Sequence, residues 1–107
     1  MKMVLAILNA DDASLVIHNL MKEGFFVTKL STTGSFLRAG NVTIIVGVEA
    51  DKVDAVLEII TQYSHSRKQI LPTAAEVGLT FQSAMLVEVT VGGATIFVFD
   101  VERFEKV

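Results

Sequence analysis

The sequence contains no cysteine and a single proline among its 107 residues. Without cysteine the chain can form neither disulfides nor thiolate sites, as is usual for proteins of the reducing cytosol. Its apolar runs all fall short of the roughly 20 residues that a membrane-spanning helix needs. The first of them, residues 3–8, is also too short for a secretory signal sequence. These absences lead us to expect a cytoplasmic protein without a membrane span.

Positive charge is also scarce, because 9 Lys and Arg stand against 12 Asp and Glu, a net charge of −3. This balance argues against a general nucleic-acid binder, which needs a basic face to neutralise many phosphates. The sequence offers no nucleophile–base signature, no Walker-type loop and no His/Cys metal set, and His18 and His65 are its only histidines. We therefore expect neither an enzyme nor a metal protein, while a small anionic ligand held at a local site remains open.

Apolar side chains are abundant, at 51% of the residues, with a mean hydropathy of +0.55. A chain of this length is one domain's worth, and a small domain has much surface to cover. The surplus therefore predicts one domain, residues 1–107, that buries an apolar face against another subunit.

The hydrophobic periodicity predicts strands and helices in the order β-α-β-β-α-β, followed by a β-hairpin. Asp11 and Asp12 are expected to cap the first helix, which ends at Gly24, and Asp51 to cap the second. The expected strands are residues 3–8, 25–30, 42–48, 69–71, 85–91 and 94–99. A long loop is expected at 73–84, before the hairpin, and the hairpin turn at Gly92–Gly93. This order indicates a ferredoxin-like α+β fold with a C-terminal β-hairpin extension, whose helices cover one face of an antiparallel sheet. The other face is left for a partner, so the fold argues for an oligomer.

Residues 28–43 carry the most suggestive chemistry in the chain. Hydroxyl groups, Arg38 and free backbone N–H groups can bind phosphate. The ring of Phe36 can stack on a base, and Asn41 can pair with an adenine edge. The alternative is a polar hairpin loop whose Phe36 and Leu37 pack into a neighbour. The basic pair 67–68, at the end of the second helix, is interpreted as a solvated helix end rather than a phosphate clamp.

Two blocks of the sequence resemble the PII-like cyclic-di-AMP receptor family, and the resemblance extends over essentially the whole chain. The blocks are Thr28-Lys29-Leu30-x-Thr32-Thr33-Gly34-x-Phe36-Leu37-x-x-Gly40-Asn41-x-Thr43 and Val87-Glu88-Val89-x-Val91-Gly92-Gly93-Ala94-Thr95-x-Phe97-Val98. The resemblance implies a signal-transduction protein that forms a homotrimer of ferredoxin-like subunits. It also implies one nucleotide in each intersubunit cleft, expected to be cyclic-di-AMP, and loops that respond to it.

The resemblance also implies a set of ligand contacts. Carried over by position they are Thr28, Phe36, Leu37, Asn41, Gly47 and Phe99, to which we add Arg38 for its charge. Phe36 and Leu37 would cover an adenine face and Asn41 would read an adenine edge. The hydroxyl of Thr28 would donate to a phosphate or ribose oxygen, and Gly47 would let the ligand approach the backbone.

The sequence departs from the family pattern at three positions, which leaves the ligand's identity open. Ser35 replaces the second glycine of the familiar Gly-Gly-Phe-Leu, and Gly24 and Phe26 stand where some relatives carry an asparagine and an arginine. A lost arginine–phosphate contact costs roughly 1.5–3 kcal/mol. The alternatives are a trimer that binds ATP or ADP, a ligand-free scaffold trimer, and a small interface enzyme for which His65 is the best candidate.

Overall fold

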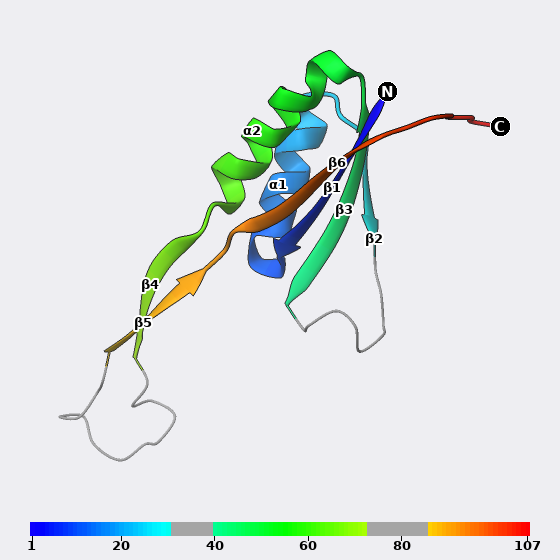
Figure 1. Ribbon diagram of the computed structural model, residues 1–107. Coiled ribbons are helices and arrows are strands. Elements are labelled where there is room, and N and C mark those ends of the chain that lie inside the picture. The colour runs from blue at the N-terminus through cyan, green and yellow to red at the C-terminus, as the bar shows by residue number, and fades with distance from the viewer. Residues whose placement is uncertain (31–39, 73–85) are drawn as a thin grey trace.

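The computed structural model describes residues 1–30, 40–72 and 86–107 (Figure 1). Its main sheet is four-stranded, in the order β2-β3-β1-β6, and every pairing in it is antiparallel. The strands are β1 (Lys2–Asn9), β2 (Val27–Leu30), β3 (Asn41–Val48) and β6 (Ala94–Asp100). The helices α1 (Ala10–Lys22) and α2 (Val53–Ser64) lie side by side on one face of this sheet (Figure 1). The architecture is a mixed α+β one, compatible with the expected ferredoxin-like fold.

The core forms between the helices and every second residue of the two central strands. Alternate strand residues point to the same face, so one side of β1 and one side of β3 turn toward the helices. The buried apolar residues are Val4, Ala6, Leu8, Ala13, Val16, Leu20, Ile44, Val46, Val48, Val56 and Ile60. The helical members recur at intervals of three or four, which places each set on one side of its helix.

The fourth strand of the sheet is not the one that the sequence analysis expected. β4 (Arg67–Pro72) pairs with β5 (Leu86–Val91) in a separate two-stranded sheet, and β6 pairs with β1. The predicted C-terminal hairpin between β5 and β6 is therefore wrong, and the hairpin extension is inserted between α2 and the last core strand. We call β4 and β5 the arm. The expected long loop at 73–84 lies outside the described residues.

Gly92 and Gly93 join the two sheets instead of forming a hairpin turn. Their φ angles are +76° and +89°, in the left-handed region that glycine enters without a steric cost. A Gly-Gly pair between two apolar runs is the usual sequence signal of a two-residue hairpin. Here β6 instead extends along the free edge of β1 from Leu8↔Ala94 to Lys2↔Asp100, a longer pairing that places Ile96 against the core.

The helix ends show which cap predictions were right. α1 is capped by Asn9, whose Oδ1 accepts a hydrogen bond from the Asp11 backbone N–H at 2.9 Å, and neither predicted aspartate is the cap. Its other end was predicted correctly, because Gly24 has a φ of +89° and its N–H donates to the Met21 carbonyl. Asp51 lies within a one-turn 3-10 helix, η1 (Ala50–Lys52), ahead of α2, and makes no cap.

Candidate functional site

The sheet face turned away from the helices is apolar and open. Its residues alternate with the core residues along each strand, and the pairing register aligns them across the sheet. They are Met3, Leu5, Ile7, Thr28, Leu30, Asn41, Thr43, Ile45, Gly47, Thr95, Phe97 and Phe99, of which Thr43 alone is buried. Within the ranges 1–30, 40–72 and 86–107, no helix lies over this face. We call it the open face, and its presence agrees with the sequence analysis.

Bare backbone and aromatic rings lie close together at one end of the open face. Gly47 is opposite Met3, and Met3 is opposite Phe99, so the three residues form one row across β3, β1 and β6. A Cβ added at Gly47 would meet no atom within 4 Å. The rings of Phe97 and Phe99 stack with centroids 6.3 Å apart and remain 48% and 44% exposed. An exposed ring pair beside uncovered backbone can receive a flat ligand ring.

The opposite end of the open face contains a small pocket beside Asn41. Asn9 and Asn41 are register partners where β1 ends and β3 begins. The pocket has a volume of about 190 Å³ and is lined by Ile7, Leu8, Asn9, Asn41, Gly92, Gly93, Ala94 and Thr95. We call it the Asn41 pocket. Gly40 accepts a 2.5 Å hydrogen bond from the Ala10 N–H, which fixes the start of β3 against α1.

The structure brings four of the predicted ligand residues onto the open face. They are Thr28, Asn41, Gly47 and Phe99. Asn41 and Gly47 stand at opposite ends of β3, six positions or about 20 Å apart at the usual strand rise, so one chain does not gather all four into a single compact cluster. Phe36, Leu37 and Arg38 lie outside the described residues, and their roles stay predictions.

Two of the departures from the family pattern have a clear structural setting. Gly24 is the first residue beyond the cap of α1, where asparagine is the next best residue after glycine. Phe26 comes just before β2 and is 90% exposed, so its ring packs against little of its own chain. Ser35 lies outside the described residues.

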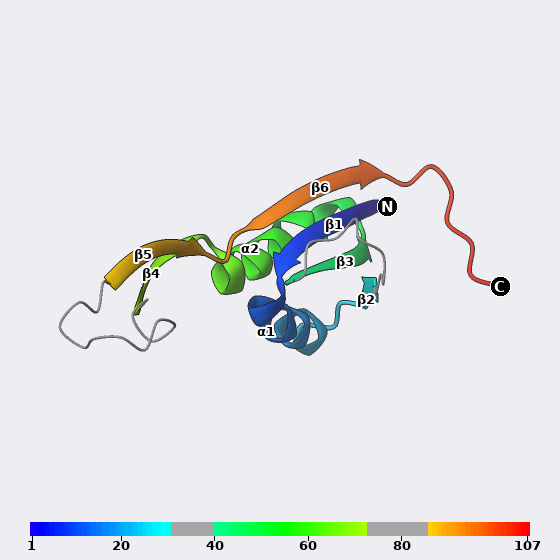
Figure 2. The same ribbon diagram turned by 90° about the horizontal axis from the view of Figure 1, so that it is seen from below.

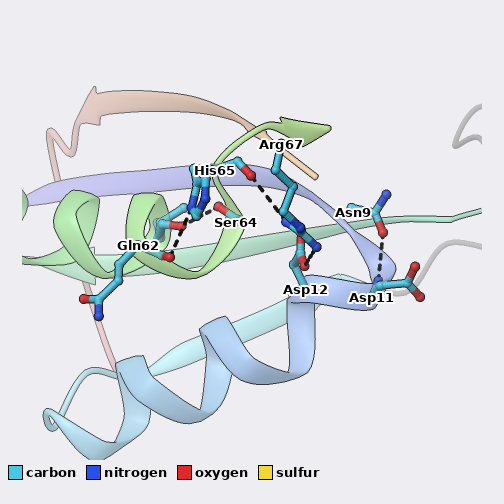
Figure 3. A network of polar contacts seen from close by, with 8 residues as sticks. Asn9, Asp11, Asp12, Gln62, Ser64, His65 and Arg67 are labelled. Atoms are coloured by element: carbon cyan, nitrogen blue, oxygen red, sulfur yellow. Dashed lines mark hydrogen bonds and ion pairs between the residues drawn. The ribbon is translucent and has the colours of Figure 1, made fainter. Parts of the chain in front are cut away.

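An ion pair that the sequence analysis missed joins α1 to the arm (Figure 3). Nη2 of Arg67 donates to Oδ1 of Asp12 at 2.8 Å, and Nη1 donates to Oδ2 and to the His65 carbonyl, each at 3.3 Å. Asp12 is only 7% exposed, and the hydrogen bond to its carboxylate raises the pKa of Arg67. The pair 67–68 begins β4 instead of ending the helix as predicted, but its side chains are still 42% and 74% exposed. Lys68 pairs with Glu88 at 3.1 Å within the arm. No local sequence signal connects two residues that are 55 positions apart.

The two histidines lie on or next to the helices. His18 is exposed on α1, and His65 follows α2, where its Nδ1 lies 3.3 Å from the Gln62 carbonyl (Figure 3). In the part of the chain that the structure describes, no group of three His, Cys, Asp or Glu residues could hold a metal ion. No helix among the described residues is long and apolar enough to cross a membrane.

Comparison with known proteins finds a family and a solved structure that the chain resembles. The sequence model of a family described as "Cyclic-di-AMP receptor" matches residues 1–107, the whole chain. The structure resembles the crystal structure of a functionally unknown protein from Pediococcus pentosaceus ATCC 25745, with 38% sequence identity and a TM-score of 0.77. That match covers 99% of this chain and 96% of the other. The family is one of receptors rather than enzymes. The chain therefore belongs to the cyclic-di-AMP receptor family.

Proposed function

We propose that this protein is a PII-like signal-transduction protein that binds cyclic-di-AMP in clefts between the subunits of a homotrimer. Loop rearrangement would relay the occupancy of these clefts to a downstream protein. The observation that carries the proposal is the presence of four predicted ligand residues on an apolar sheet face that its own helices leave open.

The composition of the open face supports assembly. Phe97 and Phe99 are half exposed in a single chain, and Leu5 and Ile45 continue the row of Phe97 across the sheet. Burying apolar surface contributes about 25 cal/mol per Å², so a chain that exposes such a face gains free energy by pairing it with another copy. Closed rotational symmetry lets identical faces meet around one axis without leaving a free end.

The spacing of the candidate residues supports a ligand site made by two chains. Asn41 and Gly47 are too far apart along β3 for a compact group to touch both in one subunit. When two subunits meet through their open faces, the Asn41 end of one can approach the Gly47 and Phe99 end of the other. A dinucleotide with two bases and two phosphates suits such a divided site, because each subunit would hold one part of it.

The chemistry of the two ends fits an adenine dinucleotide. Phe99 and the bare backbone of Gly47 offer a flat surface for a base, and the hydroxyl of Thr28 can donate to a phosphate or ribose oxygen. The amide of Asn41 can pair with the N6 and N7 edge of adenine. Phe36, Leu37 and Arg38 would complete the site from the segment before β3.

Calorimetric titration with cyclic-di-AMP, cyclic-di-GMP, ATP and ADP, each against a buffer blank, tests the proposal. We expect saturable heat with cyclic-di-AMP at one site per subunit and much weaker binding of the other three. Tighter binding of ATP or ADP would change the proposed ligand but not the proposed trimer. Absence of binding by all four at millimolar concentration, with the trimer intact, would favour a scaffold function.

A further inference from the structure

The arm joins the rest of the protein at one narrow place. β4 begins two residues after His65, and β5 ends just before Gly92. Among the described residues β4 and β5 contact mainly each other, and both views show the arm extending away from the helices (Figures 1 and 2). The direction of the arm is therefore set by the contacts where it begins and ends. We call this place the joint, made of residues 64–67, Gly92, Gly93 and Asp12.

Hydrogen bonds tie the joint to both helices. The N–H of Gly93 donates to the carbonyl of Ser64, and the buried hydroxyl of Ser64 donates to the carbonyl of Ile60 in α2. On the other side, the guanidinium of Arg67 donates to both carboxylate oxygens of Asp12, in the first turn of α1. Among the hydrogen bonds and ion pairs of the described residues, the Asp12–Arg67 pair is the only one that joins a side chain of the arm to α1.

The same ion pair packs against Gly92, one of the two glycines that line the Asn41 pocket. A Cβ at Gly92 would collide with Nη1 of Arg67, and it would lie 2.9 Å from the His65 carbonyl and 3.1 Å from Oδ2 of Asp12. Gly92 and Gly93 also form part of the wall of the Asn41 pocket. The Gly92–Gly93 link between β5 and β6 therefore faces the ion pair on one side, and it also contributes to the candidate ligand site.

Burial makes the pair sensitive to the loss of either partner. Asp12 is 7% exposed, so its carboxylate has lost most of its contact with water, and Arg67 supplies the compensating charge. Removing one partner of a buried ion pair leaves an uncompensated charge that must find water or another donor. Removal of the guanidinium would therefore release β4 from α1 and leave space beside Gly92.

We propose that Asp12 and Arg67 are positioning residues that couple the direction of the arm to the shape of the Asn41 pocket. The ion pair holds β4 against the start of α1, and it holds the Gly92–Gly93 link between β5 and β6 in the conformation that completes the pocket. A change in the pocket is thereby transmitted to the arm, and a change in the arm to the pocket. The part of this inference that concerns the ligand rests on the proposed function, whereas the part that concerns the arm does not.

The direction of the arm can be measured by pulsed electron paramagnetic resonance between two spin labels. The chain has no cysteine, so cysteines introduced at the exposed positions His18 on α1 and Gln69 on β4 are labelled without background. Labelled chains are diluted in unlabelled protein to suppress distances between subunits. We expect one narrow distance distribution in the parent protein.

The comparison of Arg67→Gln with Lys68→Gln isolates the ion pair. Both substitutions remove one cation from neighbouring positions of β4, but Lys68 pairs with Glu88 inside the arm. We expect a broadened or shifted distribution for Arg67→Gln and for the isosteric Asp12→Asn, and an unchanged one for Lys68→Gln. The double variant Asp12→Asn/Arg67→Gln leaves no unpaired charge, and it is measured as well in case a single variant unfolds. An unchanged distribution in the Arg67 and Asp12 variants would overturn the proposal.

Titration of the same variants with cyclic-di-AMP tests the coupling to the pocket. Coupling between sites typically changes affinity 5- to 150-fold, and we expect Arg67→Gln to weaken binding by about tenfold while Lys68→Gln leaves it unchanged. Equal affinities in a protein whose arm has moved would overturn the coupling. If the parent protein binds no cyclic-di-AMP, the proposed function and the coupling both fail, and the label distances still decide whether the ion pair positions the arm.

Discussion

Lys2 and Asp100 face each other across the edge of the sheet, as register partners at the start of β1 and the end of β6, and their side chains form an ion pair. The pair marks the last rung between the first and last strands of the chain. The Asp100 side chain is 82% exposed and that of Lys2 is 35% exposed, so water screens the pair and it contributes little to the free energy of unfolding. It does change how Asp100 titrates.

We predict a pKa for Asp100 below its ordinary value of 3.8, because the hydrogen bond from Lys2 and its positive charge favour the carboxylate. A lowered pKa in the folded state means that the stabilisation is present above pH 3.8 and is lost as the pH falls through the folded value. Carboxyl-detected NMR titration measures this pKa directly. Lys2→Gln should return it toward 3.8, and a value at or above that level in the parent would contradict the ion pair.

The open face predicts a trimer that a single charge can break. Light scattering at micromolar concentration should give about three times the 11.6 kDa of one chain. Phe97→Glu places a carboxylate on the open face, where burial against another subunit costs several kcal/mol, so the trimer should dissociate. Leu15→Glu is the matched control, because Leu15 is equally exposed on α1, at 51%. A monomeric parent, or equal effects of the two substitutions, would refute this mode of assembly.

Asn41→Ala should weaken cyclic-di-AMP binding without affecting the fold. A bidentate contact to a base edge contributes about 1–3 kcal/mol, or roughly 5- to 150-fold in affinity. The loss should be smaller for cyclic-di-GMP, so the preference for adenine should decline. Calorimetry on both dinucleotides measures this, with Thr61→Ala on the exposed side of α2 as the control. Equal losses for both ligands would mean that Asn41 does not read the base.

Phe26→Arg should tighten binding and make it depend more strongly on salt. The side chain of Phe26 is 90% exposed, so an arginine can replace it without disturbing the core. A new charge-assisted hydrogen bond to a phosphate is typically worth about 1.5–3 kcal/mol. Titrations at two salt concentrations measure both effects, and Phe26→Gln serves as the uncharged control. An unchanged affinity would show that position 26 is remote from the phosphates.

Gly92→Ala should destabilise the protein more than Gly24→Ala does. Both residues have positive φ, at +76° and +89°, so both substitutions carry the same backbone cost of about 1 kcal/mol or more. An added Cβ at Gly24 meets open space, whereas at Gly92 it meets Arg67, His65 and Asp12. Denaturant unfolding measures the difference. Equal losses in the free energy of unfolding would mean that the residues around Gly92 move aside at little cost.

The sequence was most informative where local patterns decide the structure. Alternation along β1 and β3, the stripe on each helix and the glycine at the end of α1 all follow from neighbours a few residues apart. The open apolar face was also predictable, because the two helices could cover only one side of the sheet. The likeness of the 28–43 block to the receptor family indicated residues that the structure then located on that face.

The predictions failed where pairing joins distant parts of the chain. Nothing local tells whether β6 pairs with β5, across a Gly-Gly turn, or with β1 at the start of the chain. The decision depends on the free edge of β1 and on the core that Ile96 completes. Asp12 was likewise predicted only as a helix cap. Its ion pair with Arg67 could not be foreseen, because the two residues become neighbours only after both helices have packed.

The two ends of the arm lie beside each other: a Cβ at Gly93 would be 3.6 Å from the Cβ of Ser66. A segment that leaves and re-enters at nearly the same point can change its length without altering the register of β6 on β1. Lengthening such an insertion costs little, as loop closure entropy grows only slowly with length. The joint thus makes the arm a separable module, whose size and sequence can diversify while the four-stranded sheet stays the same.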